Sequence, residues 1–233
     1  SVDGETVRLR DGSEYTARVV IGAGGHNDPL RKSEWKVKSL NIPVKFALMS
    51  GEFEDALELH FGSVAPGGYA WKFPKQGGAN IGLGIQTALA RGKSLNEYSE
   101  EFVSRYEGRI EFRGAGSLPM SGSIDSFVKG KHLLVGDAAG MVLPSNGAGI
   151  TIAMIGGRIA GQVVAEHLRD GTPLSEYEVR WEAQMGKVMR NSKRAFRLGS
   201  LLFRLPDWLL SLSFNRLTKP LIWRAVTCRP LIG

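Results

Sequence analysis

Two short apolar runs, each leading into a glycine-rich loop, constrain the fold of this chain more than any other feature. Residues 19–21 are followed by Gly22-Ala23-Gly24-Gly25, and residues 132–135 by Gly136-Asp137-Ala138-Ala139-Gly140. A buried strand of a parallel sheet ends in this way when its carboxyl end faces a ligand. The sequence therefore predicts an α/β or α+β fold with a binding site where these strands end.

A second pattern, of period two, fills residues 43–86. Apolar side chains alternate there along short runs that glycine, proline and acidic or amide residues separate. Alternate positions of a strand face the same side of a sheet. We therefore expect a meandering antiparallel sheet with one buried face. Its strands are expected around Val44/Phe46/Leu48, Leu57/Leu59/Phe61, Tyr69/Trp71/Phe73 and Ile81/Leu83/Ile85.

Turn and capping signals predict the elements around this sheet. Asp11-Gly12 lies between two extended runs and predicts a β-hairpin whose second strand covers residues 15–21. Ser94-Leu95-Asn96-Glu97 is a capping box, so a helix should begin there and reach about Tyr106. Residues 114–122, rich in glycine and serine, are expected to form a connection.

The carboxyl-terminal part is predicted to be helical and is strongly basic. A helix of small and apolar residues is expected over about residues 150–168, and Pro206 and Pro220 should divide the helical remainder. The chain has a formal net charge of +7. Residues 180–233 supply this excess, because eleven Lys and Arg stand there against Glu182 and Asp207.

This basic segment has three interpretations. Arg190, Lys193, Arg194 and Arg197 recur at helical spacing and precede an apolar stretch that contains Trp208. Such a segment suits an anionic membrane interface or a lipid phosphate, or its helices can pack on the domain while their cations stay solvated. Nucleic acid explains the pattern less well, because the aromatic side chains lie among leucines, and we expect no nucleic-acid partner.

Composition narrows the remaining classes. The lone Cys228 excludes an internal disulfide and a cysteine metal cluster, and no metal site is predicted. No apolar stretch is long enough to span a membrane, and no signal-peptide pattern begins the sequence. We therefore expect a cytoplasmic location, with contact at the cytoplasmic face of a membrane as the peripheral alternative. The motifs of hydrolases and phosphate-loop NTPases are missing.

Asp137 is the most informative polar residue of the glycine-rich loops. A carboxylate at the end of a buried strand needs donors, and a polyhydroxyl chain such as a ribityl group supplies them. The turn Gly147-Ala148-Gly149-Ile150 then opens the long helix, whose free N–H groups favour an anion. Together these features indicate a flavin cradle. The alternative is a helix-packing turn with Asp137 as its cap.

Tyr69, Trp71 and Phe73 alternate along one predicted strand, so their rings should project from one face. Such a row can form the wall of an apolar tunnel. On periodicity alone, such a row is more typical of the inside of a sheet than of a tunnel wall.

The motifs together resemble the carboxyl-terminal part of the geranylgeranyl reductase family, flavoproteins with the para-hydroxybenzoate hydroxylase type of fold. Residues 133–140 look like its second flavin motif, residues 144–150 like the turn beneath the flavin ring, and residues 66–74 match its Pro-x-x-Tyr-x-Trp-x-Phe-Pro motif. Residues 19–25 are similar to its Gly-Ala-Asp-Gly strand end, with Gly24 in place of the usual Asp.

The resemblance implies an FAD cofactor and two sets of site residues. The substrate, an isoprenoid lipid or prenyl diphosphate, would contact Tyr69, Trp71 and Phe73. No catalytic residue or electron donor is assigned, although His26 lies in a loop that should face the ligand. The residues expected to contact FAD are Ala23, Gly24, Gly136, Asp137, Ala138, Gly147, Gly149 and Ile150.

The same resemblance predicts a division of the chain. Residues 1–35 and 123–172 would be parts of an FAD-binding domain, and residues 36–122 an antiparallel substrate-binding domain inserted between them. Residues 173–233 would form a basic helical carboxyl-terminal region. The expected activity is an FAD-dependent reduction of prenyl C=C bonds. The alternatives are a quinone oxidoreductase-like or monooxygenase-like flavoprotein of the same fold, or a flavin-free remnant that binds lipid or membrane.

One expected motif is missing. None of the Gly-x-Gly sequences, among them Gly22-Ala23-Gly24 and Gly147-Ala148-Gly149, continues into the dinucleotide fingerprint Gly-x-Gly-x-x-Gly/Ala. In the family this fingerprint lies near the amino terminus and holds the ADP half of FAD. We therefore expect the chain to be the later part of a family member, and to bind FAD weakly and be inactive by itself.

Overall fold

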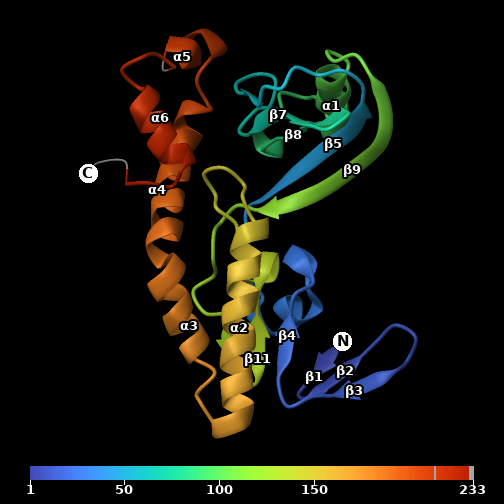
Figure 1. Ribbon diagram of the computed structural model, residues 1–233, viewed down its shortest axis with the longest axis vertical. Helices are drawn as coiled ribbons and strands as arrows, with labels where there is room; N and C mark the ends of the chain where they lie inside the picture. The colour runs from blue at the N-terminus through green and yellow to red at the C-terminus, as the bar shows by residue number, and fades with distance from the viewer. Residues whose placement is uncertain (213, 231–233) are drawn as a thin grey trace. The chain divides into compact units, whose positions relative to one another are not determined.

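The computed structural model describes residues 1–212 and 214–230, which divide into two compact units (Figure 1). Unit 1 comprises Ser1–Leu40, Pro119–Ala195 and the described residues from Arg224 onward. Unit 2 comprises Asn41–Leu118 and Phe196–Trp223. Each unit has a hydrophobic core of its own, so each is described separately.

A three-stranded sheet in unit 1 joins the two predicted buried strands. Its strands lie in the order β10 (Val128–Lys129), β11 (His132–Leu134) and β4 (Val20–Gly22). β11 and β4 run parallel, with Leu134 opposite Gly22, so their carboxyl ends lie at the same edge. The predicted mixed α/β architecture is confirmed, and the edge at which both glycine-rich loops begin is where a ligand site was expected.

The amino-terminal hairpin differs in part from the prediction. β2 (Thr6–Arg8) and β3 (Glu14–Thr16) pair across the Asp11-Gly12 turn, and β1 (Val2–Asp3) completes this sheet. The expectation of one strand over residues 15–21 is wrong. The chain leaves the hairpin sheet after Thr16 and then forms β4, which belongs to the sheet of β10 and β11. The exposed residues of β3 pair with β2 in the hairpin, whereas the apolar residues at the end of the predicted strand form β4 and pair with buried β11.

Helices cover the parallel sheet of unit 1. α2 (Ile150–Asp170) is the predicted long helix, and Gly171, with φ 80°, caps its end. α3 (Glu176–Trp181) packs against α2 (Figure 1), and a π-helical turn (Glu182–Gly186) leads into α4 (Lys187–Leu202), of which the part up to Ala195 belongs to unit 1. The short helical turns of unit 1 are Gly25–Asn27, Arg31–Trp35 and Gly136–Ala139.

Unit 2 is a five-stranded antiparallel sheet with the order β6-β7-β8-β5-β9. β5 pairs with β8 rather than β6, so the sheet is not the simple meander that was predicted. The expectation of a connection over residues 114–122 is also wrong, since β9 extends to Pro119. The bounds are β5 (Asn41–Ser50), β6 (Glu58–His60), β7 (Tyr69–Lys75), β8 (Gly78–Gly84) and β9 (Arg109–Pro119).

One face of this sheet is covered by α1 (Leu95–Val103), which begins at the predicted capping box: the Ser94 hydroxyl accepts from the Glu97 N–H, and the Glu97 carboxylate accepts from the Ser94 N–H. The helix ends at Val103, three residues before the predicted Tyr106. Ile81 and Phe102 are fully buried between helix and sheet. The remaining elements are the turn Thr87–Leu89, α5 (Asp207–Leu212) and α6 (Lys219–Val226).

Pro206 lies between α4 and α5, as predicted, whereas Pro220 stands in the first turn of α6, where its missing N–H costs nothing. Within the described residues, no helix is both long enough and apolar enough to cross a bilayer.

Candidate functional site

The two glycine-rich loops of unit 1 meet at the carboxyl edge of β4 and β11. The turn Gly25–Asn27 contacts the turn Gly136–Ala139, as the parallel pairing requires. Positive φ values at Gly25 (75°) and Gly136 (59°) explain why glycine is needed at these positions. Ala23 and Gly24 are exposed at this edge, whereas Gly136 and Ala138 are buried beneath it.

Asp137 lies among several predicted site residues. Burial raises the pKa of its carboxyl group, and the nearby His26 opposes this shift. A Cβ at Gly149 would lie 3.5 Å from Asp137 Oδ1, so the helix-opening turn also reaches this carboxylate. No hydrogen bond to the Asp137 carboxylate forms within the described part of the chain, which leaves it available to the hydroxyl groups of a ligand.

The turn before α2 is held by its own backbone and by distant side chains. The Gly147 N–H donates to the Leu143 carbonyl oxygen at 2.8 Å, and the Asn146 side chain donates to the Val226 carbonyl oxygen at 2.9 Å. Gly147 has φ 74°. Ile150, the first residue of α2, is 84% exposed. A rigid turn therefore presents the open amino end of a long helix.

Asp28 organises the loop after β4, and the sequence analysis missed it. Its buried carboxylate accepts the N–H groups of Gly24 (2.7 Å), Leu30 (2.8 Å) and Arg31 (3.1 Å). A Cβ at Gly24 would approach Asp28 Oδ2 to 2.8 Å, so glycine permits this closure. The pair Asp28-Pro29 before a helical turn is an N-cap signal that could have identified the residue.

Arg31 is a second residue that sequence reasoning did not find. It is 5% exposed, and its Nη1 donates to the His26 carbonyl oxygen at 3.0 Å. Nε and Nη2 are buried without a hydrogen-bond partner, and burial lowers the pKa of the guanidinium group. Burying a hydrogen-bond donor without a partner costs free energy, and an anionic group would be a suitable partner for Nε and Nη2 of Arg31.

These observations test whether unit 1 fits a flavin. A partnerless half-buried carboxylate at Asp137, unsatisfied donors on Arg31 and glycine backbones with little space for side chains are what a hydroxylated, anionic cofactor requires. The residues present therefore fit the ribityl and ring portion of FAD, whereas the chain has no dinucleotide fingerprint for the ADP half.

The aromatic residues of β7 form a row in unit 2. Tyr69, Trp71 and Phe73 alternate with buried Ala70 and Lys72, so their rings share the sheet face opposite α1. Ring centroids are 5.7 Å apart for Tyr69 and Trp71, and 5.9 Å for Trp71 and Phe73. All three residues are partly exposed, and burial raises the pKa of the Tyr69 hydroxyl. The predicted aromatic row is thus a half-open apolar surface.

Glycine in the neighbouring strand makes room for this row. Gly82 lies opposite Trp71, and a Cβ there would approach Trp71 Cζ2 to 2.5 Å and the Lys45 carbonyl oxygen to 2.7 Å. The Trp71 indole N–H donates to Asn80 Oδ1 at 2.9 Å. β8 therefore fixes the orientation of the Trp71 ring.

The opposite face of the same strand carries a buried ion pair. Lys72, 3% exposed, lies 2.5 Å from the Glu58 carboxylate, which also accepts from Tyr106 and contacts His60 Nε2, each at 2.9 Å. These bonds, with that from Lys72 first, lower the pKa of Glu58 to about 2. The network ties β6 to β7 beneath the aromatic row.

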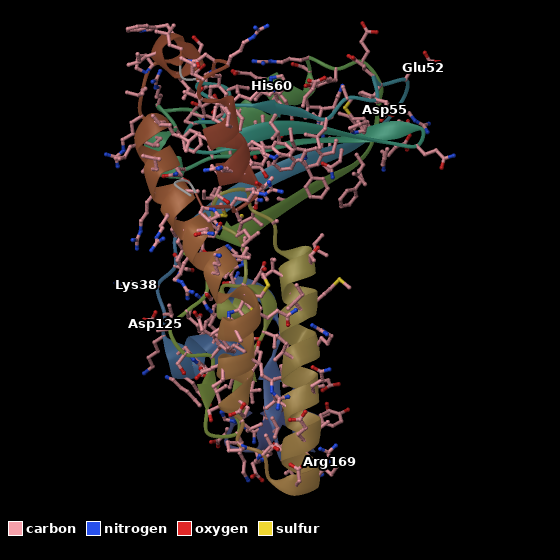
Figure 2. The ribbon with its side chains drawn as sticks, turned by 60° about the vertical axis from the view of Figure 1, so that its left-hand side comes forward. Lys38, Glu52, Asp55, His60, Asp125 and Arg169 are labelled. Atoms are coloured by element: carbon pink, nitrogen blue, oxygen red, sulfur yellow. The ribbon has the colours of Figure 1, made fainter. Side chains whose placement is uncertain are left out.

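Two histidines make specific side-chain contacts. The ring of His60, in unit 2 (Figure 2), packs edge-on against the Phe102 ring, with centroids 5.2 Å apart. His132 is in the central strand of the three-stranded sheet of unit 1, and its ring lies 2.5 Å from the Glu34 carboxylate.

Comparison with solved structures defines the class of fold. A geranylgeranyl bacteriochlorophyll reductase-like protein from Thermoplasma acidophilum matches 94% of this chain and 57% of its own, with a TM-score of 0.73 and 24% identity. HpxO of Klebsiella pneumoniae, solved with FAD and uric acid, matches 98% of this chain and 64% of its own, with a TM-score of 0.61 and 17% identity. The chain therefore shares its fold with these two proteins, one of which was solved with FAD.

Sequence comparison then relates the chain to one family. Residues 40–115 match the model of the geranylgeranyl reductase catalytic domain. A digeranylgeranylglycerophospholipid reductase from Methanothermobacter thermautotrophicus is 37% identical over 221 residues, which are 89% of this chain and 56% of the relative. The predicted relationship to the geranylgeranyl reductase family is confirmed for the part of the family's length that this chain spans, somewhat more than half of this relative.

Proposed function

We propose that this chain supplies the substrate-binding surface and the flavin-ring side of an FAD-dependent reductase that saturates prenyl C=C bonds of an isoprenoid lipid or diphosphate. The observation that carries the proposal is the half-open row of Tyr69, Trp71 and Phe73 within the region that matches the catalytic-domain model. An unsaturated apolar chain is complementary to such a surface. Residues 1–35 and 123–172 remain our prediction for the flavin-binding part.

Each part of the chain has a defined task in this reaction. FAD, when bound, supplies the hydride for the double bond. Asp137 would accept hydrogen bonds from the ribityl hydroxyls, and the turn at Gly147 and Gly149 would face the flavin ring. Tyr69, Trp71 and Phe73 would hold the prenyl chain and exclude water.

The lipid half of the proposal is tested by titrating the chain with geranylgeraniol and following tryptophan fluorescence. We expect saturable quenching, weakened by Trp71→Leu and unaffected by Tyr15→Leu, which removes an exposed aromatic ring of unit 1 outside the aromatic row. Equal quenching in both variants, or none in the parent chain, would contradict the proposal.

The cofactor half is tested by titrating FAD against a constant amount of chain and measuring flavin fluorescence. We expect weak, saturable binding that Asp137→Ala reduces further, because the carboxylate would lose its ribityl partners. Ser211→Ala, a change on exposed α5, serves as the control. Tight stoichiometric binding would contradict our expectation that the ADP half of FAD needs residues that this chain does not supply.

We also propose peripheral contact with an anionic membrane through residues 196–223. This segment exposes large apolar side chains, with Trp208 66%, Leu212 62% and Leu217 91% exposed. Arg and Lys residues accompany them, and Asp207 is its one acidic residue. Apolar side chains that enter the interface, together with cations that pair with lipid phosphate, favour anionic bilayers.

Vesicle flotation tests this contact. The chain should float with phosphatidylglycerol vesicles at low salt, less at high salt, and not with phosphatidylcholine vesicles. Leu217→Ser should reduce flotation, whereas Leu57→Ser, which alters a 66% exposed leucine outside the segment, should not. No flotation with the anionic vesicles at low salt would overturn the proposal.

A further inference from the structure

A pocket of about 300 Å³ opens in unit 2 where the carboxyl-terminal segment meets the sheet. Arg91, from the loop before α1, and Arg204, from the turn after α4, both line it. Phe203 forms part of its apolar wall. Residues far apart in the sequence thus bring two guanidinium groups to one cavity.

The acidic side chain of this pocket has hydrogen-bond partners, whereas the guanidinium groups of Arg91 and Arg204 have none in the described part of the chain. Asp207, its acidic residue, accepts the Ser63 N–H at 2.9 Å and the Ser63 hydroxyl at 2.5 Å. By contrast, neither the Arg91 nor the Arg204 guanidinium group has a hydrogen-bond or ion-pair partner among the residues that the structure describes. A neighbouring hollow of about 270 Å³ shares Ser63 and Arg91 and adds Arg105 and the ion pair of Lys93 with Glu101. The pocket therefore offers unused donors to an anion.

The backbone at Arg91 adopts an uncommon conformation. Arg91 has φ 44°, a left-handed conformation that side-chain-bearing residues rarely adopt. The following Gly92 (φ 83°) has open space around its Cα. Strained conformations of this kind gather at ligand sites.

An unbroken run of aromatic rings leads from this pocket to the row on β7. Phe203 stacks on Phe61 with centroids 6.1 Å apart and an interplanar angle of 10°. Phe61 in turn lies 6.1 Å from Tyr69, which begins the row with Trp71 and Phe73. An apolar surface that ends at unpaired guanidinium groups is complementary to a long apolar chain with an anionic head.

We propose that Arg91 and Arg204 bind the phosphate or diphosphate head of the substrate, while its prenyl chain follows the aromatic run from Phe203 to Phe73. The inference rests on the proposed function and adds the chemical class of the substrate's polar end. Guanidinium groups suit this role because their paired N–H groups match phosphate oxygens in a bidentate geometry.

The test compares geranylgeranyl diphosphate with geranylgeraniol in the tryptophan-quenching titration. Charge-assisted hydrogen bonds to phosphate are strong, so Arg91→Gln and Arg204→Gln should each weaken diphosphate binding by roughly 10- to 100-fold. Both variants should bind the alcohol as the parent chain does. Arg204→Lys should retain part of the affinity. Arg10→Gln, which removes an exposed cation of unit 1 outside the pocket and outside residues 196–223, should retain all of it.

The possible failures are distinguishable. Parent-like diphosphate binding by both glutamine variants, with the alcohol also bound, would overturn this inference and leave the proposed function standing. If the parent chain binds neither lipid, the proposed function and this inference both fail. Inorganic pyrophosphate separates the two sources of phosphate, because binding as tight as that of geranylgeranyl diphosphate would mean a free-phosphate site and overturn the assignment to the substrate. Circular dichroism confirms that each variant is folded.

Discussion

Single buried charges decide much of this structure, and sequence patterns did not reveal them. Asp28, Arg31 and Lys72 are each less than 6% exposed, although their residue types are normally found at the surface. Their burial depends on partners that the fold supplies, such as the loop amides for Asp28 and the carboxylate of Glu58 for Lys72. Local spacing predicts which face of a strand a residue occupies, but not whether a charge there finds a partner.

Glu58→Gln tests the energetic weight of the buried pair. Removing the carboxylate leaves the buried Lys72 ammonium group without an opposite charge, with the Glu54 carbonyl oxygen at 3.3 Å as its remaining partner. Because the Glu58 side chain is 31% exposed, the free energy of unfolding at neutral pH should fall by about 1–3 kcal/mol. Urea denaturation measures this change. The double variant Glu58→Gln/Lys72→Met should recover most of the loss, because no unpaired charge remains. Equal losses in the single and double variants would contradict this account.

The same pair predicts a pH dependence. The folded-state pKa of Glu58, about 2, is lower than its ordinary value of 4.5. Its stabilisation should therefore be complete above about pH 4.5 and disappear as the pH falls toward 2. The stability difference between the parent chain and Glu58→Gln should shrink over this window. A difference that stays constant from pH 6 to pH 3 would rule out titration of Glu58 as its source.

Some glycines in the strands lie where the backbone is close to a neighbouring side chain or strand. At β9 such glycines led to the wrong prediction of a connection. The glycine and serine content of residues 114–122 predicts a connection, yet a Cβ at Gly114 would approach the Phe46 ring to 2.3 Å. The strand needs glycine at this position in order to pass over that ring. By contrast, the capping box at Ser94 was predicted correctly because its hydrogen bonds join residues three apart.

Gly82→Ala tests this explanation at the centre of the sheet. The new methyl group would meet a backbone carbonyl oxygen as well as the Trp71 ring, so we expect a loss of roughly 1–3 kcal/mol in the free energy of unfolding and a changed Trp71 emission. Gly161→Ala in α2 is the contrasting change. Its surroundings are open, and it should stabilise the helix by about 1 kcal/mol. The expectation fails if Gly82→Ala is as stable as the parent chain.

At the scale of the whole molecule, two hydrophobic cores share no residue. One surrounds α2 and the parallel sheet, and the other lies between α1 and the antiparallel sheet. Alternating patterns predicted the separate sheets. They did not predict that residues 196–223 join unit 2, since the ring of Phe203 reaches its partner Phe61 only through tertiary packing.

Separate cores predict two unfolding transitions in scanning calorimetry. Ile159→Ala lies in the core of unit 1 and Ile81→Ala in the core of unit 2, and each should cost about 2–5 kcal/mol. We expect each variant to lower the midpoint of one transition and leave the other unchanged. A single transition that both variants lower equally would show that the units unfold together.

The membership of residues 196–223 in unit 2 also sets the boundaries for exchanging parts among related reductases. The region that matches the catalytic-domain model ends at residue 115. Within it, however, the Phe61 ring stacks on Phe203, and the Ser63 N–H donates to the Asp207 carboxylate. A chimera that transplants only residues 40–115 would separate both pairs. A functional exchange of this proposed substrate-binding surface therefore needs both segments of unit 2, residues 41–118 and 196–223, to be transferred together.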